Sequence, residues 1–84
     1  MKEIKYLMLP NDEPVIFPDY IGHDDMALKL GEVKPISGGF VQFMCNPTDH
    51  TEILITCYGE STSLGLKSTE RDTKIIQRMF KDWY

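Results

Sequence analysis

The sequence predicts an α+β fold in the order β-β-α-β-β-α, with a four-stranded antiparallel sheet and a C-terminal amphipathic helix packed on one face. Residues 40–58 hold the densest β-branched and aromatic run, interrupted by strand-breaking residues, which indicates a long hairpin. Residues 69–83 carry apolar residues at helical spacing, which indicates a helix with one apolar face. We expect a single domain over residues 1–84, because this length suffices for one core.

The first part of the chain predicts a shorter hairpin and a short helix. Residues 4–9 and 15–17 are apolar runs separated by a proline-containing turn, and Pro18 ends the second strand or places it at a sheet edge. Residues 24–30 begin with two acids and are followed by Gly31, as is typical of a helix with a glycine stop.

The central hairpin consists of residues 40–45 and 51–58, joined by a turn over residues 46–50. Because side chains alternate along a strand, one face takes Val41, Phe43 and Cys45 with Ile53, Ile55 and Cys57. The other face is mixed and takes Phe40, Gln42, Met44, Glu52, Leu54, Thr56 and Tyr58. The glycine pair at 38 and 39 predicts a bulge or a close backbone approach before this hairpin. Residues 59–68 are expected to be irregular.

The last helix is expected to run from about Thr69 to Trp83. Thr69 is followed three residues later by Asp72, which resembles a capping box. The apolar stripe that should pack on the sheet is Ile75, Ile76, Met79, Phe80 and Trp83. Five of the bases also gather near this end, namely Lys67, Arg71, Lys74, Arg78 and Lys81. They form either a solvated helix face or a contact surface for an acidic partner.

Charge and composition exclude several function classes. Thirteen acids against nine bases give a net charge of −4, which argues against a nucleic-acid binder, because such proteins need a basic stripe. No apolar stretch approaches the roughly 20 residues that cross a bilayer, and the charged N-terminus lacks a signal-peptide core. Cys45 and Cys57 do not face each other in this hairpin, so we expect free buried thiols in a cytoplasmic protein.

Four side chains of metal-ligand type lie in the chain, namely His23, Cys45, His50 and Cys57. Zinc needs four such ligands converging at about 2.0–2.3 Å. Their spacing matches no zinc knuckle, and both cysteines are assigned to the core face of the hairpin. We therefore expect structural cysteines, with no metal and no cofactor.

Two further clusters could carry catalysis. His23, Asp24 and Asp25 form a general-base or cation-site candidate, although two acids in a first helical turn explain the same residues. Ser61 and Ser63 lie between a strand and a helix, but the glycine of a nucleophile elbow is missing where Ser63 stands. We expect no enzyme and no catalytic residue. A small hydrolase or nuclease using His23, Asp24 and Asp25 is kept as an alternative.

The loop over residues 59–68 contains glycines and hydroxyls ahead of a helix, which could hold a phosphate. A Walker pattern is absent, and Glu60 would repel an anion. A polar connecting loop explains the same residues.

A protein-binding surface is the hypothesis that the sequence favours. The chain has more aromatic and methionine residues than one small core needs, and such residues are enriched at interfaces. They are Tyr6, Tyr20, Phe40, Met44, Tyr58, Trp83 and Tyr84. We expect the partner-binding residues to be Phe40, Met44, Glu52, Leu54, Tyr58, Glu60, Ser61 and Ser63. Aromatics would anchor the partner and carboxylates would steer it. The alternatives are that the short helix and the loops cover this face, or that it joins a structural homodimer.

Residues 37–41 (SGGFV) and 58–66 (YGESTSLGL), with 14–17 (PVIF) ahead of them, resemble small uncharacterised proteins of bacteriophages and prophages. The similarity spans most of the chain. No activity is attached to that group, so no functional residue is carried over. The resemblance implies a protein that binds and blocks a host protein. We therefore expect an inhibitor of a host defence or nucleic-acid-handling complex, of anti-CRISPR type, without direct contact to nucleic acid.

Overall fold

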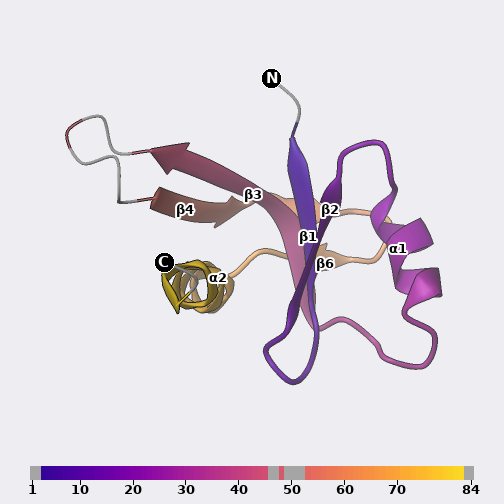
Figure 1. Ribbon diagram of the computed structural model, residues 1–84. Coiled ribbons are helices and arrows are strands. Elements are labelled where there is room, and N and C mark those ends of the chain that lie inside the picture. Colours follow the sequence, from indigo (N-terminus) through magenta and orange to yellow (C-terminus); the bar gives the residue numbers. More distant parts are fainter. Residues whose placement is uncertain (1–2, 46–47, 49–52, 83–84) are drawn as a thin grey trace.

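The computed structural model describes residues 3–45, 48 and 53–82 of the chain. Its elements are β1 (Ile4–Met8), β2 (Pro14–Pro18), α1 (His23–Lys29), β3 (Ser37–Cys45), β4 (Ile53–Tyr58), β5 (Glu60–Ser61), β6 (Leu66–Lys67) and α2 (Glu70–Asp82). Strands β2-β1-β3-β4 form one antiparallel sheet, with α2 against it (Figure 1). The predicted α+β architecture is confirmed. Neither helix in the described ranges is both long and apolar enough to span a bilayer.

Strand β1 occupies the interior of the sheet, because it pairs with β2 on one side and β3 on the other. Its residues Tyr6, Leu7 and Met8 are fully buried. Strand β2 is an edge strand bounded by Pro14 and Pro18. Proline cannot donate to a strand ladder, so this position agrees with the expectation drawn from Pro18.

The cross-strand pairs of the central hairpin join the residues that were predicted to share a face. Val41 pairs with Cys57, Phe43 with Ile55 and Cys45 with Ile53, so the two cysteines are not opposite each other. The predicted turn at 46–50, apart from Thr48, lies outside the described residues.

Strand β3 begins at Ser37 and not at Phe40 as predicted, so the glycine pair lies within the strand, opposite Leu7 and Tyr6 of β1. The predicted close backbone approach at this pair is confirmed. A Cβ atom on Gly39 would lie 2.6 Å from the Tyr58 carbonyl oxygen, and one on Gly38 would lie 2.8 Å from Leu7 Cδ2. No side chain fits at either position without a shift of its surroundings.

Helix α2 is anchored to β1 through one buried carboxylate. The Asp72 backbone N–H donates to Thr69 Oγ1 (3.1 Å), and the Thr69 N–H donates to Asp72 Oδ2 (3.3 Å), which confirms the capping box. The Tyr6 hydroxyl donates to the same Asp72 Oδ2 at 2.7 Å. Asp72 is only 1% exposed, so this contact joins the start of the helix to the interior strand.

Three residues of the predicted apolar stripe of α2, Ile75, Ile76 and Phe80, pack on the sheet. Ile76 belongs to the buried core with Tyr6, Met8, Val41 and Ile55, and partly buried side chains surround this core. Among these, the Phe80 and Phe43 rings meet edge to face at 5.1 Å. We call this side of the sheet the helix-covered face.

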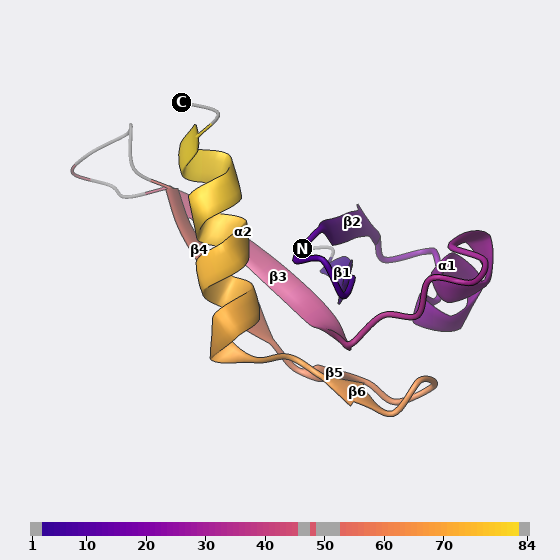
Figure 2. The ribbon, with the colours of Figure 1, turned by 90° about the horizontal axis from the view of Figure 1, so that it is seen from below.

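The same helix also protects the outer edge of β4. Thr73 Oγ1 accepts the Cys57 backbone N–H (3.0 Å), and Gln77 Nε2 donates to the Ile55 carbonyl (2.9 Å). Figure 2 shows α2 running along β4. Unpaired strand edges invite pairing with another chain, so these two side chains block pairing at this edge.

The structure corrects one element. Residues 59–68, expected to be irregular, form a second hairpin in which Glu60 pairs with Lys67 and Ser61 with Leu66. Both strands contact β3. Each strand has two residues, which is too short for an alternating pattern to reveal it in the sequence.

The buried Tyr6 hydroxyl predicts a loss of stability in alkali. Burial, followed by the hydrogen bond to Asp72, raises the pKa of Tyr6 far above its ordinary value of 10.0. The unfolded chain therefore loses this proton near pH 10 while the folded chain keeps it. The contribution of Tyr6 to stability is complete below about pH 10 and falls above it by about 1.4 kcal/mol per pH unit. Burial also raises the pKa of the Cys57 thiol above its ordinary value of 9.0, although hydrogen bonds with Thr73 and Tyr6 act to lower it. A further loss of stability therefore begins near pH 9.

Urea denaturation between pH 7 and 12 measures how the free energy of unfolding falls with pH. We expect Tyr6→Phe to lower the free energy of unfolding at neutral pH by about 1–3 kcal/mol, because Asp72 loses a buried donor. The variant should also show a shallower alkaline loss. Tyr20→Phe, at an exposed tyrosine, is the control and should keep the steep loss. Parallel curves for the wild type and Tyr6→Phe would contradict the assignment.

Candidate functional site

The face of the sheet opposite α2 has a closed half and an open half. One row of cross-strand partners runs over it, from Phe17 through Lys5 and Phe40 to Tyr58. Partners in register point to the same side, and these residues alternate with those of the helix-covered face. Whatever covers this row decides how much of the face is available to a partner.

His23, the first residue of α1, closes the half over β1 and β2. Its ring meets Phe17 edge to face at 5.4 Å and Phe40 at 5.7 Å. Its Nε2 lies 2.8 Å from the Gly39 carbonyl oxygen, at hydrogen-bond distance. Lys5 Nζ donates to the Ile21 carbonyl at 2.9 Å, just ahead of the helix. These contacts hold the start of α1 against the sheet and bury this half.

The half over β3 and β4 is open. Met44 is 53% exposed, Leu54 46% and Tyr58 39%. Met44 and Leu54 are direct cross-strand partners, and the Tyr58 ring stacks on Phe40 at 5.6 Å with 26° between the planes. We define the open sheet face as Phe40, Gln42, Met44, Leu54, Thr56 and Tyr58. None of the described helices or strands lies over the Met44 end of the hairpin on this side, whereas α2 lies on the other (Figure 1).

The open sheet face thus gathers four of the predicted partner-binding residues, Phe40, Met44, Leu54 and Tyr58. The expectation that α1 and the loops might cover this face holds only for the β1–β2 half. Gln42 and Thr56 are exposed on the same face. Strand alternation places both residues on this face, although they are not among the predicted partner-binding residues.

The remaining predicted residues lie elsewhere. Glu60 is exposed on β5, where its cross-strand partner is Lys67. Ser61 is only 1% exposed, and its Oγ lies 3.5 Å from Ser63 Oγ. Ser61 therefore faces inward and offers no surface to a partner, while Ser63 is exposed. Glu52 lies outside the described residues.

The structure locates two more of the aromatic residues that exceed the expected needs of the core. Tyr6 is a core residue and the donor to Asp72, which corrects its assignment to a surface. Tyr20 is highly exposed in the segment between β2 and α1. Trp83 and Tyr84 lie outside the described residues.

The catalytic alternative does not form a convergent site. His23 is buried between Phe17 and Phe40, whereas Asp24 and Asp25 are exposed in the first turn of α1. The three side chains therefore point to different environments, and the acids occupy the positive end of the helix, as the simpler explanation expected.

The zinc candidates are likewise separated where they can be placed. His23 lies on the α1 side of the sheet, and Cys57 contacts the core under α2. His50 and the Cys45 side chain lie outside the part that can be described. Within that part, no group of three or more His, Cys, Asp or Glu side chains is arranged to hold a metal ion.

Comparisons with protein-family models, with curated proteins and with solved structures return no match. No function is therefore carried over to this chain from a matched relative or solved structure.

A substitution at Gly39 should disturb the strands beneath the open sheet face. Gly39→Ala places a Cβ 2.6 Å from the Tyr58 backbone oxygen, so the two strands must separate. We expect a cost of about 1–3 kcal/mol in unfolding free energy, with altered NMR shifts of the Phe40 and Tyr58 rings.

Gly22→Ala is the matched control. Its Cβ would also lie 2.6 Å from an oxygen, but that oxygen belongs to the exposed Asp24 side chain, which can rotate away. We expect a cost below about 1 kcal/mol, because alanine caps a helix less well than glycine. The Tyr58 ring shift should stay unchanged, whereas Phe40 touches His23, the neighbour of Gly22, and is left out of the comparison. Equal effects of the two variants on the Tyr58 shift would contradict the packing described at Gly39.

Proposed function

We propose that this protein is a non-enzymatic binding module that docks on another protein through its open sheet face. The observation that carries the proposal is the exposed cross-strand pair Met44–Leu54 beside the stacked Phe40–Tyr58 pair. Side chains of this kind, Met and aromatics above all, are enriched in the centres of protein interfaces. Gln42 and Thr56 between the two pairs supply hydrogen-bonding groups for a partner.

The rigidity of the face supports the same proposal. Its strands are held by their ladder, its Tyr58 end by the stack on Phe40, and Phe40 in turn by His23. A surface already held in its binding conformation loses little side-chain entropy when a partner docks. Strand pairing is a less favourable mode of binding here, because Thr73 and Gln77 occupy the β4 edge.

The class of partner follows from the resemblance to phage and prophage proteins. We propose a host protein or protein complex, with defence and nucleic-acid-handling complexes, CRISPR effectors among them, as the first to test. A cytoplasmic location belongs to this proposal, because such complexes work there and the described cysteine, Cys57, is a free thiol. Direct nucleic-acid binding forms no part of it, because the open sheet face has no described basic residue.

A structural homodimer through the same face is the second candidate. A twofold interface would place the Met44–Leu54 pair of one copy on that of the other, since such interfaces are self-complementary. The size of the protein in solution separates the two candidates.

The test starts with the partner recovered by affinity capture from host lysate and continues with its measured Kd. The variant Met44→Lys/Leu54→Lys adds two charges to the open sheet face and should weaken the complex by at least about tenfold, or 1.4 kcal/mol. The control Leu28→Lys/Val33→Lys changes two exposed apolar residues elsewhere and should leave the Kd unchanged.

Three results decide the matter. Selective loss in the Met44/Leu54 variant supports the proposal. A concentration-dependent dimer that the same variant dissociates supports the homodimer instead. An unchanged Kd in both variants, or neither partner nor dimer, would contradict the role of the open sheet face.

A further inference from the structure

A second surface, independent of the open sheet face, lies on the outward side of α2. Arg71, Lys74, Arg78 and Lys81 are all exposed and follow one another at intervals of three and four residues. This spacing places them on one side of the helix, over about 15 Å of its length. The buried Ile76 points to the sheet, so the stripe faces away from it. We call these four residues the basic stripe.

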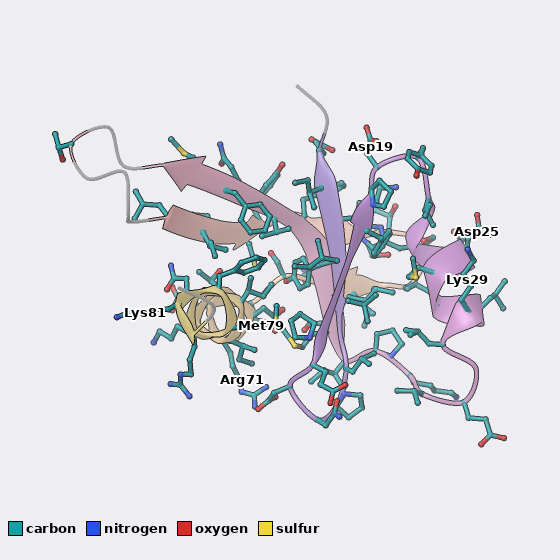
Figure 3. The ribbon with its side chains drawn as sticks, in the orientation of Figure 1. Asp19, Asp25, Lys29, Arg71, Met79 and Lys81 are labelled. Carbon is teal, nitrogen blue, oxygen red and sulfur yellow. The ribbon has the colours of Figure 1, made fainter. Side chains whose placement is uncertain are left out.

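The positive charge of the stripe is only slightly neutralised within the molecule. Arg71 forms an ion pair with Asp12 at 2.6 Å, in which both side chains are about half exposed. Such surface pairs contribute little and are easily exchanged. Lys74, Arg78 and Lys81 have no acidic partner in the described part of the chain. Figure 3 places Asp19 and Asp25 at the α1 end, away from Lys81 and Arg71. The chain has a net charge of −4, but the outward side of α2 is a locally positive surface.

A shallow apolar hollow lies beside the stripe. Ile75 and Met79 line it together with Arg78 and Asp12. Ile75 and Met79 are one residue beyond Lys74 and Arg78, on the flank of the helix that faces the β1–β2 turn. Figure 3 shows Met79 on this flank. A basic stripe and an apolar hollow thus share one edge.

We propose that the basic stripe and this hollow bind an acidic, amphipathic segment of a protein. Carboxylates of the segment would pair with Lys74, Arg78 and Lys81, and an apolar side chain would enter the hollow between Ile75 and Met79. Charge complementarity selects an acidic occupant. The apolar part of the wall, Ile75 and Met79, selects a peptide over a nucleic-acid backbone, because phosphodiesters offer nothing apolar to bury there.

The test is an NMR titration of the full-length, isotope-labelled protein with a synthetic peptide of about 15 residues. The peptide carries glutamates and two leucines on one helical side. At about 50 mM salt we expect shifts concentrated in Arg71, Ile75, Arg78 and Met79, with weaker binding as salt rises. Lys74→Glu/Arg78→Glu should weaken binding at least about tenfold. Both positions are exposed, and circular dichroism checks that the variant is folded.

Two matched controls separate specific binding from general charge attraction and from binding without the apolar hollow. Lys29→Glu/Lys34→Glu makes the same change in net charge on the α1 side, at exposed lysines, and should leave the Kd within about twofold. A peptide with serines in place of the leucines should bind at least about fivefold more weakly. Equal loss in both charge variants, equal binding of the leucine-free peptide, or tighter binding of oligothymidylate to the same stripe would overturn the proposal.

Discussion

The hydrogen bond from the Tyr6 hydroxyl to Asp72 Oδ2 fixes how the rest of the molecule is arranged. Asp72 also closes the capping box with Thr69, so one buried carboxylate both starts α2 and joins it to the interior strand β1. Because the first turn of α2 is fixed there, the apolar residues around Ile76 pack on the sheet. Thr73 and Gln77 then reach the β4 edge. A buried carboxylate is costly unless its hydrogen bonds are complete, so this arrangement tolerates little variation.

The two functional surfaces follow from that constraint. One helix of thirteen residues covers one face of the sheet and leaves the other to α1, which has seven residues. His23 closes the half over β1 and β2 by meeting Phe17 and Phe40. The half around Met44 and Leu54 stays exposed. The outward side of the same helix presents the basic stripe. The proposed binding surfaces therefore lie on opposite sides of the sheet and can be tested separately.

Sequence patterns predict the parts of this structure that depend on local chemistry. The alternation of Val41, Phe43, Ile55 and Cys57 predicts which residues share a face, the Thr69–Asp72 pair predicts the helix start, and the glycine pair predicts the close strand approach. Residues whose environment is set by distant contacts escape such reasoning. Tyr6 finds its partner sixty-six residues away, His23 turns inward to rings on two strands, and Ser61 is buried by a hairpin too short to leave a pattern. The open sheet face was found by alternation, but its extent depends on where α1 lies.

In the free protein, α2 and α1 leave the Met44–Leu54 end of the sheet open. Paramagnetic attenuation of methyl NMR signals by a soluble gadolinium chelate, on the monomer at low concentration, tests it most directly. We predict strong attenuation at Met44 and Leu54, and little at Val41 and Ile55, which lie under α2, or at the buried Ile76 of that helix. Protection of Met44 and Leu54 equal to that of Ile55 would contradict it, because the face would then already be covered within the chain.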